Sequence, residues 1–284
     1  MKVFIQAMRP KTLPASFIPP LVTFIIYSST SNKKPYLLLA CCLLCAVSIQ
    51  IATNLFNDVL DFKKGADKMR IGPQRVTSSG LVSPELVNRW AISVIFVAIL
   101  AAIPLIFTGG IPILILGIIS LYLSYGYTGG PLPLAYNGLG EIFVFLFFGL
   151  SSVCGSYYLF SGELNFSILL LGCIFGCLTT TLICINNLRD RIEDAKVNKN
   201  TLATRMSEAQ YKLFTLSTIL SPYLLLFFFQ KYSPVNLTFL ALVPATKLIL
   251  IVYKSKGTDL NKGLSLAGAH LVVFSILLIC STLI

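Results

Sequence analysis

The stretch PYLLLACCLLCAVSIQIATNLFNDVLDFKKGAD, residues 35–67, decides the fold of this chain. Its first part, Pro35–Thr53, is almost entirely apolar and approaches the length of about 20 residues that a helix needs to cross a bilayer. Its second part is rich in amide and carboxylate side chains, namely Asn54, Asn57, Asp58, Asp61 and Asp67. A carboxylate at membrane depth is costly, so a helix that ends in this way needs a cationic partner.

The composition of the whole chain agrees with a membrane setting. Of 284 residues, 56% are hydrophobic and only 12% are charged, and the mean hydropathy is +0.83. Soluble domains carry about 25% charged residues, so this composition indicates an integral membrane protein. The N-terminal segment MKVFIQAMRPKTLPAS lacks the apolar core and cleavage site of a signal peptide, so we expect the first span to remain in the mature chain.

Apolar runs separated by polar links predict an all-α integral membrane protein with nine transmembrane helices. The predicted spans are Thr12–Ser29, Tyr36–Asp61, Val87–Phe107, Pro112–Tyr127, Leu139–Leu159, Ile168–Arg189, Tyr211–Phe229, Leu237–Tyr253 and Gly263–Leu283. Residues 1–284 are interpreted as one transmembrane domain, in which residues 62–86 and 190–210 form the two long polar loops.

The positive charges predict the orientation of these spans. If the N-terminus is cytoplasmic, 18 of the 22 lysines and arginines fall on the cytoplasmic side, as the positive-inside rule requires. The net charge of +11 is therefore interpreted as a sign of orientation, and no nucleic-acid partner is expected. An anionic substrate or anionic lipid is the second interpretation of this charge.

Two acidic clusters stand at the predicted cytoplasmic ends of the second and sixth spans. NDVLD (Asn57–Asp61) and NNLRD (Asn186–Asp190) share the pattern N-[DN]-x-x-D, and the second continues to Glu193 and Asp194. Spacings of three and four residues bring each set onto one helix face. The side chains offer only oxygen ligands, since no cysteine adjoins either cluster and the single histidine, His270, is distant in sequence. Oxygen-only sets favour Mg²⁺ or Ca²⁺ over Zn²⁺.

Basic residues follow both acidic clusters and complete the pattern. Lys68, Arg70 and Arg75 follow the first, and Lys199 and Arg205 follow the second. Divalent ions that bridge carboxylates to phosphates, with lysines and arginines on the remaining oxygens, suit a substrate with a polyanionic head. An apolar interior between helices suits an oily tail, and a prenyl diphosphate has both.

Other interpretations of these patterns stay open. An acid–amide helix end beside a basic loop is ordinary solvated surface in many proteins, and the positive-inside rule alone explains basic loops. A cation-coupled transporter is an alternative from another class, although transporters carry their charged residues near the bilayer midplane. A lipid-binding membrane protein without catalytic activity is a further alternative.

The two clusters resemble the aspartate-rich motifs of the UbiA superfamily of intramembrane prenyltransferases, with the first at Asn57-x-x-x-Asp61 and the second at Asp190-x-x-x-Asp194. Further stretches resemble the branch that prenylates 1,4-dihydroxy-2-naphthoate in the menaquinone pathway: RPKTLPAS, RIGPQRVTSSGLVSP, GLGEIFVFLFFG and NNLRDRIEDAKVNKNTLATR. Branches that use 4-hydroxybenzoate, homogentisate or haem are alternatives within the superfamily.

The resemblance implies nine helices around a central cavity open to the cytoplasmic side and to lipid. The default expectation for location is a multi-pass protein of the bacterial plasma membrane. The resemblance also implies two Mg²⁺ ions, a polyprenyl diphosphate donor, a dihydroxynaphthoate acceptor and loss of CO₂. We expect metal ligands at Asn57, Asp58, Asp61, Asp67, Asp190 and Asp194, and diphosphate contacts at Lys68, Arg70, Arg75, Lys199 and Arg205. Gly65 stands where many members have a third acid, which leaves open whether Asp58 or Asp67 contacts metal.

Several further residues are candidates with weaker patterns behind them. Tyr127 is expected to face the reacting carbon or the acceptor ring, with an interfacial aromatic belt as the alternative for it and for Tyr125. Glu141 is expected to orient the acceptor, with a structural contact as the alternative. Arg9 and Lys11 are expected either to contact the diphosphate or to begin the first span, and His270 is interpreted as a packing residue.

Overall fold

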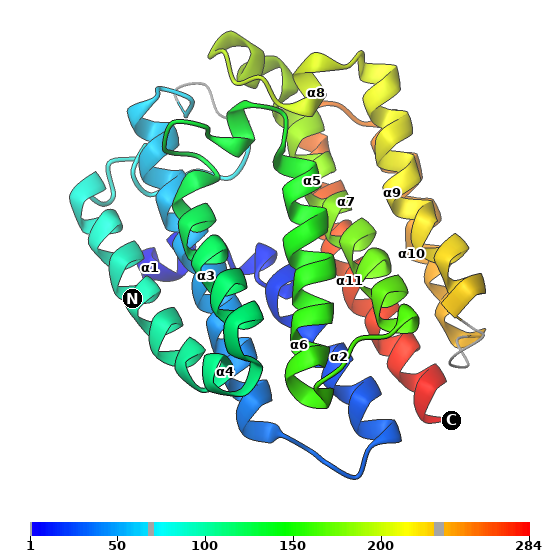
Figure 1. Cartoon of the computed structure of the whole chain (residues 1–284). Coiled ribbons are helices and arrows are strands. Elements are labelled where there is room, and N and C mark those ends of the chain that lie inside the picture. Colours follow the sequence, from blue (N-terminus) through cyan, green and yellow to red (C-terminus); the bar gives the residue numbers. More distant parts are fainter. Residues whose placement is uncertain (1, 68–70, 230–235) are drawn as a thin grey trace.

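The computed structural model describes residues 2–67, 71–229 and 236–284. Long helices run roughly parallel to one another and form an elongated bundle (Figure 1). In chain order the α-helices are α1 (Lys2–Met8), α2 (Pro14–Thr30), α3 (Tyr36–Lys63), α4 (Pro84–Gly126), α5 (Gly140–Val144), α6 (Ser152–Ser161), α7 (Phe166–Lys196), α8 (Leu202–Arg205), α9 (Glu208–Phe229), α10 (Leu242–Lys254) and α11 (Leu260–Leu283). A π-helical segment, Phe145–Ser151, joins α5 to α6, and short 3₁₀ turns lie at Pro10–Thr12, Leu134–Tyr136, Asn236–Ala241 and Gly257–Asp259.

The all-α membrane fold is confirmed. In the described part of the chain, the number of helices that are long and apolar enough to cross a membrane is smaller than the nine predicted spans. Seven helices among the described residues qualify as spans, or eight if the bent pair Lys2–Thr12 and Pro14–Thr30 forms one. One reason is that α4 contains both the third and the fourth predicted spans. Its 43 residues would extend about 65 Å as a straight helix, roughly twice the apolar thickness of a bilayer.

Helix α4 bends sharply at Gly110. The dihedral angles there are φ 63° and ψ −149°, a combination that essentially only glycine adopts. The ribbon of α4 turns back on itself accordingly (Figure 1). The sequence TGGI was expected to be a short link between two helices, and the structure reduces that link to a kink.

Helix α7 is the central element of the bundle. In its most apolar window 72% of the residues are buried inside the protein, against 22% for the corresponding windows of α3 and α4. Gly149 of the π-helical segment lies directly against Gly176 of α7, where a Cβ would come within 2.3 Å of the Gly176 Cα. Small residues permit such close helix packing in membranes. The outer helices therefore present their apolar side chains to lipid.

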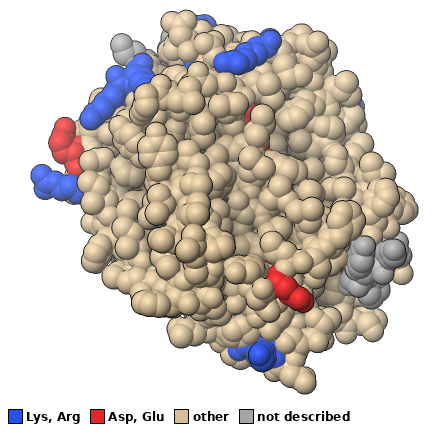
Figure 2. Space-filling view, viewed as in Figure 1, with Lys and Arg blue, Asp and Glu red and all other residues tan. Residues whose placement is uncertain are grey.

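The surface agrees with this arrangement. In Figure 2 the charged side chains lie mostly near the rim of the face shown, and its broad centre is almost entirely uncharged. Exposed apolar residues on the outer helices, such as Phe96, Phe107 and Phe227, match the lipid contact expected of a multi-pass membrane protein.

Candidate active site

A cavity of about 340 Å³ opens between the helices that carry the two acidic clusters. Asn57 and Asp61 of α3 line it on one side, and Asn186 and Asn187 of α7 line it on the other. The residues that continue its lining are largely apolar and extend between the helices, among them Cys42, Leu105, Ile113 and Leu159. The cavity therefore joins a polar end to an apolar chamber.

Asp61 is buried at the polar end and is surrounded by donors. Its Oδ2 accepts a hydrogen bond from Arg75 Nη2 at 2.7 Å, and its Oδ1 accepts one from the Tyr136 hydroxyl at 2.8 Å. Burial and the nearby Asp61 carboxylate raise the pKa of Tyr136, so this phenol stays protonated and donates. The Nε atom of Arg75 also lies 3.2 Å from Oδ1 of Asp67, whose side chain is buried.

Asp58 has a different task from Asp61. Its two carboxylate oxygens accept the main-chain N–H groups of Val76 and Thr77, at 3.2 and 3.1 Å. Asp58 thereby fixes the loop that brings Arg75 to the site, and it does not line the cavity. Asn57 does line the cavity. Its side-chain oxygen accepts a hydrogen bond from the Thr128 hydroxyl, and its main-chain carbonyl accepts one from Arg75 Nη1.

The second cluster approaches the first through a lysine. Lys199 Nζ lies 3.4 Å from Asp194 Oδ1 and 4.0 Å from Asp61 Oδ2, so a single ammonium group is shared by carboxylates of both clusters. The other oxygen of Asp194, Oδ2, is buried and has no hydrogen-bond partner in the described part of the chain. The polar loop predicted from residue 190 begins as helix, because α7 continues to Lys196.

Asp190 is held by its sequence neighbour. Arg189 donates from Nε to Oδ1 at 2.7 Å and from Nη2 to Oδ2 at 2.6 Å. Arg189 also donates to Asn186 and Asn261, and a Cβ on Gly72 would lie 2.6 Å from Arg189 Nη2. The loop that follows the first cluster therefore lies against the base of the second.

The N-terminal segment reaches the cavity because Asn54 holds it. Asn54 Nδ2 donates to the carbonyl of Met8 at 2.9 Å and to Thr12 Oγ1 at 3.0 Å. Between them Arg9 has φ 53° and ψ 69°, a left-handed conformation that is costly for a residue with a side chain, and it lines the cavity. Lys11 is exposed and does not line the cavity.

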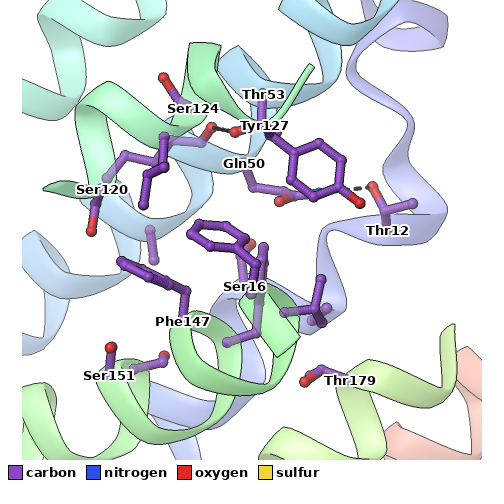
Figure 3. Close-up of a pocket in the computed structure, with 18 of the residues that line it drawn as sticks. Thr12, Ser16, Gln50, Thr53, Ser120, Ser124, Tyr127, Phe147, Ser151 and Thr179 are labelled. Carbon is purple, nitrogen blue, oxygen red and sulfur yellow. Dashed lines mark hydrogen bonds between the residues drawn. The ribbon is translucent and has the colours of Figure 1, made fainter. Parts of the chain in front are cut away.

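Glu141 and Tyr127 both form part of the cavity wall. Oε1 of Glu141 accepts hydrogen bonds from Asn187 Nδ2 at 2.8 Å and from the Tyr211 hydroxyl at 2.5 Å. Figure 3 shows the ring of Tyr127 with its hydroxyl end toward Thr12, near Gln50. Burial raises the pKa of Tyr127, and the carboxylates of Glu141, Asp61 and Asp194 raise it further, so this phenol stays protonated.

The remaining predicted residues lie elsewhere. Arg205 is exposed and donates from Nε to the carbonyl of Asn200, and Lys68 and Arg70 fall outside the described residues. Tyr125 is half exposed and packs edge-on against Phe56. His270 is buried with its Nε2 2.6 Å from the Tyr223 hydroxyl and does not line the cavity, and its interpretation as a packing residue stays a prediction.

Sequence reasoning missed four contributors: Tyr136, Thr128, Arg189 and Tyr211. Tyr136 is one of 12 tyrosines and carries no pattern that distinguishes it. Arg189 was counted only as a positive charge, because adjacent helical residues do not normally face each other. The signal for Tyr211 was equally weak, since it begins a predicted span where aromatic residues are common.

The donor set fits Mg²⁺. Within the described ranges, no three His, Cys, Asp or Glu side chains gather into a ready-made metal site. Mg²⁺ typically takes one or two carboxylates and completes its shell with water and substrate phosphates, so it needs no such gathering. The buried and unpartnered Oδ2 of Asp194, together with the oxygens of Asp61 and Asn57, offers ligands of the required kind.

The model of the UbiA prenyltransferase family matches residues 17–276. The chain belongs to this family. Two bacterial relatives are named 1,4-dihydroxy-2-naphthoate octaprenyltransferase. The one from Escherichia coli is 33% identical over 239 residues, covering 82% of this chain and 77% of the relative. The one from Haemophilus influenzae is 32% identical over 275 residues, covering 90% and 87%.

Solved structures of UbiA-type proteins share the fold. A digeranylgeranylglyceryl phosphate synthase superposes with a TM-score of 0.64 at 13% identity, over 99% of this chain and 98% of the other. A UbiA homologue from Archaeoglobus fulgidus, bound to GPP and Mg²⁺, superposes with a TM-score of 0.62 at 12% identity, over 97% and 99%. At these identities the likeness concerns the arrangement of helices in the family.

Proposed function

We propose that this membrane enzyme transfers a polyprenyl group from an allylic diphosphate to 1,4-dihydroxy-2-naphthoate, with loss of CO₂, in menaquinone synthesis. The observation that supports the proposal is that Asp61 and Lys199 line one cavity, where the Lys199 ammonium lies near both Asp61 of the first acidic cluster and Asp194 of the second. The relatives at 31–33% identity named for this reaction support the choice of acceptor.

The polar end of the cavity is assigned to the diphosphate. Asp61 and Asp67, with Asn57, are proposed to hold one Mg²⁺, and Asp190 and Asp194 a second. Bound there, Mg²⁺ would neutralise phosphate oxygens as the leaving group departs. Asp58 is assigned to the loop, because both of its oxygens already accept main-chain N–H groups. Asp190 would have to exchange part of its pairing with Arg189 for the metal.

Arg75 and Lys199 are proposed to contact the remaining diphosphate oxygens. Both line the cavity and already lie beside carboxylates, so they are oriented toward the charge that develops as the allylic C–O bond breaks. Arg9 is proposed as a third contact from the N-terminal segment, and Lys68 and Arg70 stay predictions. Arg205 is assigned a structural role in the 199–205 turn, because it is exposed.

The apolar chamber is assigned to the prenyl chain, and the wall formed by Tyr127 and Glu141 to the aromatic acceptor. Enclosure between helices excludes water, which would otherwise capture the allylic cation. The N-terminus and the polar end of the cavity are proposed to lie on the cytoplasmic side of a bacterial plasma membrane, and the positive-inside pattern supports this orientation.

Purified protein in detergent or nanodiscs tests this function directly. We expect Mg²⁺, dihydroxynaphthoate and a polyprenyl diphosphate to yield a prenylated naphthoquinol without the carboxylate, identified by mass spectrometry. Turnover with 4-hydroxybenzoate and none with the naphthoate would overturn the choice of acceptor. Solute uptake into vesicles without any prenylated product would favour the transporter alternative.

A further inference from the structure

The carboxyl group of Glu141 is divided between a satisfied oxygen and an unsatisfied one. The residue is only 1% exposed, and it lines the cavity. Oε1 accepts from both Asn187 and Tyr211, whereas Oε2 is buried and accepts no hydrogen bond from any described residue. Leaving a buried carboxylate oxygen unsatisfied is expensive, so this oxygen calls for a partner that the described residues do not supply.

Three separate elements fix the orientation of this carboxyl group. Glu141 belongs to α5, Asn187 to α7 and Tyr211 to α9, and both donors act on the same oxygen. A side chain anchored in this way at Oε1 has its free Oε2 in one defined position. Such preorganisation is typical of groups that act on a substrate.

Glu141 lies close to Tyr127 in the wall of the cavity. Its neighbour Gly140 is so close to Tyr127 that a Cβ there would lie 3.0 Å from the phenol oxygen. Tyr127, Glu141 and Asp61 all line the same cavity. A substrate bound in this cavity would therefore share it with both Glu141 and Asp61.

We propose that Oε2 of Glu141 accepts the proton of the acceptor hydroxyl group next to the carboxylate-bearing carbon, and that Tyr211 and Asn187 are its positioning residues. This inference rests on the proposed function, because it requires a hydroxylated aromatic acceptor. It gives Glu141 a chemical role in the transfer, where the sequence predicted only orientation.

The proton transfer balances the reaction. The ring carbon that bears the carboxylate forms a bond to the prenyl carbon, while the allylic C–O bond breaks and diphosphate leaves with the electron pair. The adjacent O–H proton moves to Glu141, and its electrons form a C=O bond. The resulting β-keto carboxylate loses CO₂, the electrons of that C–C bond generate an enolate, and the enolate oxygen recovers the proton from Glu141.

Glu141→Gln is the informative variant. Glutamine keeps an oxygen that accepts from Asn187 and Tyr211, and replaces Oε2 with an amide nitrogen that cannot take the proton. We expect kcat to fall by about 100-fold or more, the usual scale for a lost general base, with the KM of both substrates within threefold of wild type. Glu141→Asp should recover part of the loss, and exposed Glu163→Gln is the matched control that keeps wild-type rates.

Tyr211→Phe provides a second, independent variant in case Glu141→Gln does not fold. It removes one donor to Oε1 and leaves the carboxyl group in place, so we expect about a tenfold loss in kcat with unchanged donor KM. A kcat for Glu141→Gln within threefold of wild type overturns the inference, as does a raised acceptor KM with unchanged kcat. Wild-type protein that does not turn over dihydroxynaphthoate overturns the proposed function instead.

Discussion

Arg75 Nη2 lies 2.7 Å from Oδ2 of Asp61, and both side chains are buried at the polar end of the cavity. Burying a carboxylate without a partner is prohibitive, and the arginine, supplied by the loop after α3, removes that penalty. The same guanidinium lies beside Asp67, so one cation serves two acids of the first cluster. The site is thus organised around charge neutralisation, which is the requirement of a diphosphate and its metals.

Asp61 and Asp58 separate the catalytic from the structural role of the first cluster. We expect Asp61→Asn to reduce kcat by at least about 100-fold, because Asp61 faces the substrate end, and also to lower the melting temperature in detergent, because Arg75 loses a buried charged partner. Asp58→Asn should lower the melting temperature with a much smaller loss of kcat, since its oxygens hold Val76 and Thr77. The expected destabilisation is about 1–3 kcal/mol. An active, fully stable Asp61→Asn variant would contradict the assignment.

Lys199 is expected to contribute to donor binding. In Lys199→Ala we expect the KM for prenyl diphosphate to rise by about tenfold or more, because a charge-assisted contact to phosphate is lost near two carboxylates. Lys196→Ala is the matched control, since Lys196 lies three residues away and is exposed. Equal effects of the two substitutions in steady-state kinetics would show that only the general charge of the loop matters.

Tyr136 is expected to act through Asp61. Removing its hydroxyl in Tyr136→Phe deletes the hydrogen bond to Oδ1, worth about 1.5–3 kcal/mol for a charged acceptor, and we expect turnover to fall by about tenfold or more. The raised pKa of this phenol keeps it protonated through neutral and mildly alkaline pH, so Tyr136 should add no ionisation to the rate profile there. A wild-type rate in Tyr136→Phe would remove it from the site.

Gly110 is expected to be indispensable for the bend in α4. With φ of 63° and ψ of −149°, the backbone at this position is strained for any residue that has a Cβ. Gly110→Ala should therefore destabilise the protein by about 1–3 kcal/mol in thermal unfolding. Gly268→Ala is the control, because Gly268 lies inside α11 and a Cβ there would lie 4.0 Å from its nearest neighbour, the Lys11 carbonyl oxygen. Comparable melting temperatures for both variants would show that α4 accommodates the change.

The sequence predicted the elements whose signals are local. The apolar run before Asp61 predicted α3 at Tyr36–Asp61, and the helix extends over Tyr36–Lys63. Helical spacing predicted that Asn57 and Asp61 share a face, and both line the cavity. The kink at Gly110 was predicted only as a link, because a glycine pair marks a break in a helix without determining its angle.

Contacts between distant segments could not be predicted in this way. Asp58 has the same residue type and helix face as Asp61, and only the path of the loop decides that it caps Val76 and Thr77. Arg189 pairs with adjacent Asp190, and its guanidinium lies against Gly72 in the loop after α3. Helical periodicity predicts neither of these two contacts. Arg205 was grouped with Lys199 by charge, yet it lies at the end of α8 and is exposed.

The most direct test of the central claim is Mn²⁺ binding in the presence of inorganic pyrophosphate, followed by electron paramagnetic resonance. Mn²⁺ is a hard ion that accepts the same oxygen ligands as Mg²⁺. If carboxylates of α3 and α7 hold one diphosphate between them, pyrophosphate should strengthen Mn²⁺ binding to the wild type, and Asp61→Asn and Asp194→Asn should each abolish that gain. A gain that survives either substitution would contradict a shared site.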